Sequence, residues 1–319
     1  MELSEDILSR VKQLQDKYAA MGQDLVSYLD GLLHADYLTY WDYIHLDTLL
    51  SLQSPRTSFP DEEIFIMYHQ ITELYFKLSL HELKQVCLSP TDDVAFVTSR
   101  VKRVNRYFRN LTLSFEVMVD GMDPAQFLKF RMSLLPASGF QSAQYRMVEI
   151  YATDFIHLVD KDHRDKFSKS DRNIRDQFSY IYWKAGATEL ATGKKTLTLQ
   201  QFEAKYSDEL ISLAESLQGR TLATKYTEFE AAGKDVSELK AALRELDVHV
   251  NVNWPLSHYK SAVRYLQKDP EDIRATGGTN WQKYLPPRFQ KRIFYPELWT
   301  EEELTEWGKA WVLETLSKM

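Results

Sequence analysis

A single histidine lies in the middle of a strongly apolar helical pattern over residues 65–78. Apolar side chains alternate spacings of four and three, at Ile64, Tyr68, Ile71, Tyr75 and Leu78. This stripe predicts a helix that faces the core. His69 belongs to a second line with Phe65, Thr72 and Phe76, so its imidazole would project between two phenyl rings. The pattern favours a flat, apolar ligand over a metal ion, although it is also typical of a histidine that only packs in the core. Glu73, one turn further on, either orients His69 or faces solvent.

A second histidine, His258, lies in another helical pattern. Pro255 suits the start of a helix, and the apolar stripe consists of Leu256, Tyr259, Val263 and Leu266. By position alone, His258 is an ordinary helical histidine.

Three further features carry groups that suit substrate binding. Arg131 stands in an aromatic segment at 127–134, where an arginine is usually a surface residue with a buried stem. Tyrosines at spacings of three, Tyr37, Tyr40 and Tyr43, predict one aromatic face of a helix, and packing alone would explain it. The sequence Thr-Gly-Gly at 276–278 is by itself only a weak loop signal.

Four sequence blocks occur in order between residues 37 and 299. They are YLTYWDYIHLDTLLSLQ at 37–53, FIMYHQITEL at 65–74, FRMSLLPASGFQSAQYR at 130–146, and the His258 helix followed by TGG. This order closely resembles the tryptophan 2,3-dioxygenase family. Because the block SGFQSxQYR is long and allows few substitutions, chance agreement in all four blocks is very improbable.

The resemblance implies an all-α protein with the helical haem-dioxygenase fold of the tryptophan/indoleamine dioxygenase type. Residues 1–319 would form a single haem-binding domain with an insertion at about 160–198. Helices within 1–55 would be exchanged with a neighbouring subunit of a homotetramer. The cofactor would be haem b, active as Fe²⁺, with His258 as its axial ligand.

The resemblance also implies a reaction, in which O₂ is inserted across the indole C2–C3 bond of L-tryptophan to give N-formyl-L-kynurenine. This is the first step of tryptophan degradation by the kynurenine pathway. His69 would accept a hydrogen bond from the indole N–H, and its role would be orientation more than proton abstraction. The matching positions for the indole pocket are Phe65, Phe127 and Leu134.

Other matching residues would hold the amino-acid part of the substrate. Arg131 would bind the carboxylate, because a planar guanidinium can pair with both oxygens. Thr276 would contact the amino-acid group from a closing loop, and Tyr40 and Tyr43 would reach the active site of a neighbouring subunit.

One departure from the family pattern leaves alternatives open. After Gly278 the chain continues Thr279-Asn280-Trp281, where the family commonly has small residues and another glycine. A haem-dependent monooxygenase or hydroxylase of another indole or tyrosine derivative, on the same fold, is one alternative. A non-enzymatic helical interaction protein that binds no haem is the other.

Composition agrees with small-molecule chemistry. The chain has 319 residues, 44% of them hydrophobic, which is enough for a large core. The formal net charge of −7 gives no general attraction to nucleic acid or to an anionic membrane. Cys87 is the only cysteine, so an intrachain disulfide and covalent haem attachment are excluded, and histidine is the expected haem ligand. The amino terminus has no signal-peptide pattern and no window resembles a membrane span, which predicts a cytoplasmic protein.

The elements expected to position these residues are all helices. Pro60 with the acidic residues 61–63 predicts that the His69 helix begins near residue 60. Capping boxes are expected at 123–126, 198–201 and 300–303, and no sustained strand alternation or repeat occurs.

Other chemistries fit less well. The segment His81-Glu82-Leu83-Lys84-Gln85 lacks the second histidine of a zinc-protease motif. The basic residues within 100–109 suggest a solvated helix face more than an RNA site. The chain has no phosphate-binding glycine-rich loop, nucleophile elbow or dinucleotide fingerprint.

Overall fold

The computed structural model describes residues 3–35, 38–167, 173–188, 192–266 and 287–309. The chain divides into two compact units, Met1–Ser54 and Pro55–Met319. Across the described residues the structure is helical, and β pairing is limited to the isolated bridges Val159–Ile181 and Thr188–Lys195. The predicted all-α fold is therefore confirmed.

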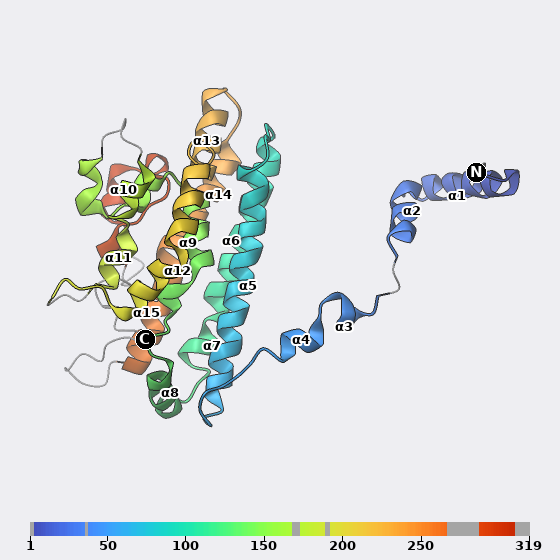
Figure 1. Cartoon of the computed structure of the whole chain (residues 1–319). Helices are drawn as coiled ribbons and strands as arrows, with labels where there is room; N and C mark the ends of the chain where they lie inside the picture. Colours follow the sequence, from blue (N-terminus) through green and yellow to red (C-terminus); the bar gives the residue numbers. More distant parts are fainter. Residues whose placement is uncertain (1–2, 36–37, 168–172, 189–191, 267–286, 310–319) are drawn as a thin grey trace. The chain divides into compact units, whose positions relative to one another are not determined.

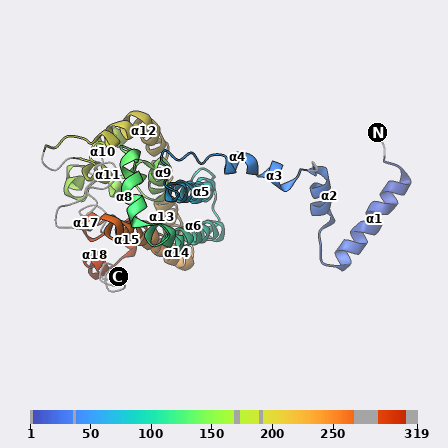
Figure 2. The same cartoon turned by 90° about the horizontal axis from the view of Figure 1, so that it is seen from below.

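The larger unit is a bundle of long helices, with the short helices α7 and α8 toward one end and α10 and α11 beside the bundle (Figure 1). Helix α5 packs against α6 and α9, α6 packs against α14, and α12 packs against α9. The view along the bundle shows these helices grouped around a common interior (Figure 2). The long helices are α5 (Asp61–Cys87), α6 (Val94–Ser114), α9 (Ala143–Ala152), α12 (Leu197–Ser216), α13 (Leu222–Ala231), α14 (Ser237–Val248) and α15 (Trp254–Leu266).

Shorter elements complete this unit. The α-helices are α7 (Glu116–Val119), α8 (Pro124–Phe130), α10 (Ile174–Phe178), α11 (Tyr182–Gly186), α17 (Pro287–Gln290) and α18 (Glu301–Thr305). The 3₁₀ turns are η1 (Arg131–Leu134), η2 (Gly139–Gln141), η3 (Phe155–Leu158), η4 (Lys161–Lys166) and η6 (Pro296–Leu298), and η5 (His249–Asn253) is a π-helix. Within the described ranges, no helix combines the length and apolar character needed to cross a bilayer.

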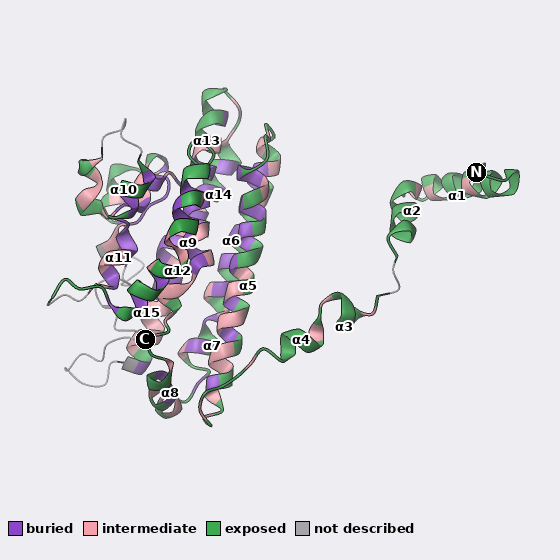
Figure 3. Cartoon of the chain, in the orientation of Figure 1, coloured by how far each residue is buried: buried purple, intermediate pink, exposed green. Residues whose placement is uncertain are grey.

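Helix α5 begins at Asp61 after Pro60, as predicted, but its core-facing stripe differs from the predicted one. Tyr68 is buried, whereas Ile71 and Leu78 are exposed. The buried face instead continues through Thr72 and Phe76, in the second line that contains His69. Both lines are rich in apolar residues, so the helical period alone could not decide which one faces the bundle. Figure 3 shows the buried faces of the long helices turned toward one another.

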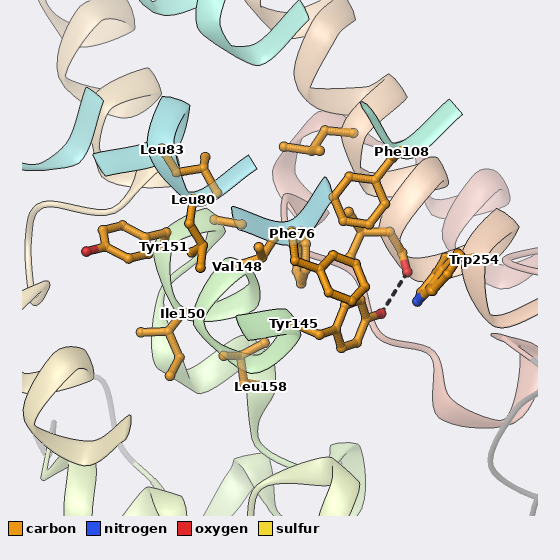
Figure 4. Packing of buried hydrophobic residues seen from close by; sticks show 14 of the residues in the cluster. Phe76, Leu80, Leu83, Phe108, Tyr145, Val148, Ile150, Tyr151, Leu158 and Trp254 are labelled. Atoms are coloured by element: carbon orange, nitrogen blue, oxygen red, sulfur yellow. Dashed lines mark hydrogen bonds between the residues drawn. The ribbon is translucent and has the colours of Figure 1, made fainter. Parts of the chain in front are cut away.

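Aromatic rings fill the centre of the bundle (Figure 4). Phe76 of α5 contacts Phe108 of α6 at a centroid distance of 6.0 Å, Tyr145 of α9 at 5.4 Å and Trp254 of α15 at 5.7 Å. Each side chain of this size buries a large apolar area, and offset or edge-on contacts add to the stabilisation. The packing therefore joins the helix that carries His69 to the helix that carries His258.

The basic segment of α6 forms ion pairs within the fold. The predicted solvated face is confirmed, since Lys102, Arg103, Arg106 and Arg109 are exposed. Arg100 and Arg103 also both donate to the buried carboxylate of Glu82 on α5. Arg109 donates to Glu245 on α14. These arginines neutralise acidic groups of the neighbouring helices.

Helix caps agree with the sequence at some sites and differ at others. Thr300 and Glu303 form the predicted reciprocal capping box. Asp123 caps α8, as expected, but Gln126 accepts a hydrogen bond from the Asp61 N–H instead of completing a box. The prediction at 198–201 was wrong by two residues, because Thr196 caps α12 and its hydroxyl accepts from the Leu199 N–H.

The described residues of the unit Met1–Ser54 form the helices α1 (Glu5–Ala20), α2 (Leu25–Leu33), α3 (Tyr40–Tyr43) and α4 (Leu46–Leu50). None of these helices has a buried residue. Large apolar side chains lie on its surface, and those of Leu32 and Leu33 are 73% and 79% exposed. An apolar surface of this kind is typical of a segment that packs against another molecule.

Candidate active site

His69 projects from the middle of α5, where the helix itself fixes its tautomer. Its Nδ1 lies 2.7 Å from the carbonyl oxygen of Phe65, one turn earlier. Because a carbonyl oxygen only accepts hydrogen bonds, Nδ1 carries the proton and Nε2 of the neutral ring carries the lone pair. Burial lowers the pKa of His69 below its ordinary value of 6.5, which favours this neutral form. His69 can therefore accept a hydrogen bond at Nε2.

His258 has the same local geometry on α15. Its Nδ1 lies 3.0 Å from the carbonyl oxygen of Trp254, so Nε2 again carries the lone pair. Burial lowers its pKa from 6.5 to about 4, and the nearby His69 acts in the same direction. The ring also contacts Phe115, at a centroid distance of 4.6 Å, and Trp254, at 4.4 Å. The fold thus holds a second neutral imidazole, whose Nε2 can serve as a metal ligand.

An aromatic wall lies beside His69. The Phe65 ring lies against that of His69, tilted, with a centroid distance of 4.1 Å. Helix α8 supplies Phe127 and Phe130, at 6.2 and 5.7 Å from the Phe65 ring. The sequence predicts that the His69 ring lies between two phenyl rings, those of Phe65 and Phe76. In the structure, Phe76 instead contacts the aromatic rings at the centre of the bundle.

Arg131 is the first residue of η1, directly after α8. It is 6% exposed, which differs from the usual surface position of such an arginine. Loss of water on burial lowers its pKa from the ordinary value of 12.5. A guanidinium that remains charged in such a setting is suited to bind an anionic group. Leu134 at the end of η1 is half-buried against the hydrophobic core.

Three of the predicted residues lie in the other unit or outside the described residues. Tyr40 and Tyr43 lie in the unit Met1–Ser54, with side chains 69% and 74% exposed. Thr276 lies outside the described residues. The structure brings together Phe65, His69 and Phe127 through ring contacts, and His69 is close enough to His258 to affect its pKa. Arg131 directly follows α8.

The motif SGFQSAQYR at 138–146 holds helices together. Ser138 and Gln141 form a capping box at η2, and Ser142 caps α9. Gln144 donates to the Glu73 carboxylate at 2.8 Å, so Glu73 links α5 to α9. Arg146 donates to Glu149 and to the hydroxyl of Tyr182. The contacts of Gln144 with Glu73 and of Arg146 with Tyr182 join residues distant in sequence, which local spacing alone did not reveal.

Comparison with known proteins identifies the family. The tryptophan 2,3-dioxygenase family profile matches residues 32–174. The chain is 30% identical over 286 residues to a tryptophan 2,3-dioxygenase of Ruegeria sp. (strain TM1040), covering 83% of this chain and 92% of that protein. It is 29% identical over 265 residues to a tryptophan 2,3-dioxygenase of Herpetosiphon aurantiacus, covering 82% and 96%. The chain belongs to the tryptophan 2,3-dioxygenase family.

The tryptophan 2,3-dioxygenase family implies a haem cofactor, and the residues of this chain fit it. In the described part of the chain, no group of three or more His, Cys, Asp or Glu side chains could hold a metal ion. Haem provides four nitrogen ligands of its own, so one neutral imidazole with a free lone pair is sufficient to hold its iron. His258 meets this requirement at Nε2, and its Nδ1–H contact is the backbone partner usual for such ligands.

A cavity of about 360 Å³ lies away from these residues. Its walls come mainly from α9, η3, α10 and α12 and the turn that follows α12. Among its lining residues are Ile150, Thr153, Phe155, Ile174, Leu217 and Gly219. None of the predicted site residues lines it, so the histidine pair and not this cavity defines the candidate active site.

Proposed function

We propose that this chain is a haem-dependent tryptophan 2,3-dioxygenase, which cleaves the indole C2–C3 bond of L-tryptophan with O₂ to give N-formyl-L-kynurenine. This reaction would open the kynurenine pathway of tryptophan degradation. The observation that carries the proposal is the pair of neutral imidazoles, His69 and His258, beside an aromatic wall in a member of this family. Each imidazole has its Nε2 lone pair available.

His258 would hold haem b through Nε2. When bound in its ferrous form, haem supplies the binding and activation of O₂. Burial keeps His258 neutral near pH 7, and the Trp254 carbonyl fixes the ring at Nδ1. The protein would contribute a ligand that is already in the required tautomer.

His69 would orient the substrate by accepting the indole N–H at Nε2. Phe65, Phe127 and Leu134 would contact the flat, apolar indole ring. Since His69 is held neutral by burial and by its Nδ1–H bond, the interaction is a hydrogen bond and requires no proton transfer.

The amino-acid end of the substrate would be held by charge. Arg131 is buried next to the aromatic wall, where a carboxylate can pair with both arms of its guanidinium. Thr276 would contact the amino-acid group, as the family resemblance implies.

The active form would be a homotetramer, in which residues 1–55 are exchanged and Tyr40 and Tyr43 reach a neighbouring site. Two apolar surfaces support this proposal. One is on the unit Met1–Ser54, and the other is the exposed line of Met67, Ile71, Leu74 and Leu78 on α5. Burial of both on assembly would remove apolar area from water, at about 25 cal/mol per Å².

Product analysis tests the proposal directly. The purified chain would be reconstituted with haem, reduced, and given L-tryptophan and O₂, and the product would be identified by mass spectrometry. Addition of two oxygen atoms is expected, and with ¹⁸O₂ both labels should be found in the product. A gain of one oxygen atom would instead indicate a monooxygenase.

A matched pair of variants gives the control for this assay. His258→Ala should lose stoichiometric haem binding, whereas His81→Ala, at an exposed position of α5, should keep it. A His258→Ala variant with full haem content and an unchanged spectrum would contradict the assignment of the ligand.

A further inference from the structure

A proline interrupts the backbone hydrogen bonds of the helical run that carries His258. Helix α14, the π-helix η5 and α15 follow one another without a gap from Ser237 to Leu266. The Trp254 N–H donates to the His249 carbonyl, five residues back, in the π pattern. The next bond of that pattern would run from residue 255 to the Val250 carbonyl, but Pro255 has no N–H. Pro255 therefore lies in the first turn of α15, as predicted, and directly after η5 in a continuous helical run.

Two side chains donate to the Val250 carbonyl in place of the missing N–H. The Tyr145 hydroxyl donates to it at 3.1 Å, and Nη2 of Arg292 donates to it at 3.2 Å. Nη2 of Arg292 also donates to the Tyr145 oxygen at 2.7 Å. A buried carbonyl without a donor is costly, so these contacts stabilise the turn before His258.

Arg292 is held in this position by further contacts in the buried interior. It is 4% exposed, and it pairs with the fully buried carboxylate of Glu149 on α9, which also pairs with Arg146. Its Nε donates to the side-chain oxygen of Asn251, which lies on the same π turn. Arg292 thus contacts both the backbone and a side chain of η5.

We infer that Arg292, together with Tyr145 and Glu149, is a positioning group for the haem ligand His258. The π turn ends at Asn253, and the next residue, Trp254, provides the carbonyl that fixes Nδ1 of His258. A change in the turn would therefore shift both the helix and the hydrogen bond that orients the imidazole. The inference rests on the proposed function, because it takes His258 as the axial ligand.

The test compares two variants, each of which removes a side-chain donor to the Val250 carbonyl, with a matched control variant. Arg292→Met removes the donor, and the buried Glu149 carboxylate keeps its ion pair with Arg146. Tyr145→Phe removes only one hydroxyl donor and is the milder change. Arg100→Met on α6 is the control, because it also removes an arginine from a buried glutamate, Glu82, but lies away from η5.

Two readouts separate positioning from simple stabilisation. In the haem-loaded protein we would measure the iron–histidine stretching band and the rate of haem transfer to apomyoglobin. Haem release at least about tenfold faster, with a shifted or broadened band, is expected for Arg292→Met. Tyr145→Phe should change both in the same direction but less, and Arg100→Met should match the wild type even if its melting temperature falls.

The apoprotein provides a readout that does not depend on haem. Nitrogen-15 shifts of labelled histidines should show His258 as the Nδ1–H tautomer in the wild type and in Arg100→Met. Arg292→Met, or Tyr145→Phe if Arg292→Met does not fold, should show a mixture of tautomers. Folded variants with the wild-type tautomer, band and haem release would overturn the inference. A wild-type protein without a histidine-ligated haem spectrum would instead refute the proposed function, and the apoprotein result would still decide the positioning role.

Discussion

Acidification should destabilise the folded chain through His258. The pKa of this imidazole is about 4 in the folded protein, below its ordinary value of 6.5, because burial disfavours the charged ring. As the pH falls through 6.5, the unfolded chain binds a proton that the folded chain does not bind until about pH 4. His258 therefore does not reduce the free energy of unfolding above pH 6.5, and it reduces this free energy progressively as the pH falls from 6.5 to 4.

The size of the effect follows from the two pKa values. At about pH 5, the pH lies about 1.5 units below the unfolded pKa and still above the folded one. One pKa unit corresponds to about 1.4 kcal/mol. The free energy of unfolding should therefore be lower by about 2 kcal/mol at about pH 5 than at about pH 8 because of His258. Burial also lowers the pKa of His69, His157 and His249, so the whole chain should lose more than this.

Urea unfolding of the apoprotein, followed by circular dichroism, would measure this difference. Wild type, His258→Gln and the control His81→Gln would be compared at about pH 8 and about pH 5. Glutamine cannot take up the proton, so the loss on acidification should be about 2 kcal/mol smaller in His258→Gln than in the wild type. His81→Gln should behave like the wild type, because its exposed side chain is in water in both states. Equal losses in the wild type and His258→Gln would refute the reasoning.

Three other outcomes follow from the proposed site. His69→Ala should lower turnover about tenfold or more through loss of a hydrogen bond worth about 1–2 kcal/mol, and wild-type turnover in steady-state assays would show that His69 only packs. Arg131→Lys should raise KM for L-tryptophan about tenfold or more with a smaller change in kcat, and an unchanged KM would count against carboxylate binding. Light scattering should give a mass of about 150 kDa, four times the 37.4 kDa of one chain, and a fully active monomer would contradict the shared-site proposal.

The sequence predicted the helical elements better than the packing between them. Pro60 and the following acidic residues correctly placed the start of α5, and the Thr300 box correctly placed the start of α18. The predicted core face of α5 was wrong. Ile71 and Phe76 lie on two different apolar lines of this helix, and the line of Phe76 is the buried one. Only contacts with α6, α9 and α15 decide between these lines, and such contacts join residues far apart in the chain.

The same limit applies to the candidate site. Both histidines were identified from their motifs, and the assignment of their roles stays a prediction. Phe115, which contacts His258, had no local signal, because its partner is more than a hundred residues away. The spacing of four between Trp254 and His258 did contain a signal, since an imidazole can reach the carbonyl one turn earlier. The side-chain links of Arg292 to Val250 and Glu149 depend on the folded arrangement.

The main-chain contacts of His69 and His258 have a consequence for how this family can diverge. At both histidines the tautomer is set by a carbonyl of the same helix, and no carboxylate or hydroxyl side chain is required for it. Any residue at position 65 or 254 offers that carbonyl, provided the helix is intact. Substitutions around the two rings can therefore change the shape of the pocket, and with it the preferred substrate, while the ligand and acceptor nitrogens keep their chemistry. Such a site can evolve new substrates one side chain at a time.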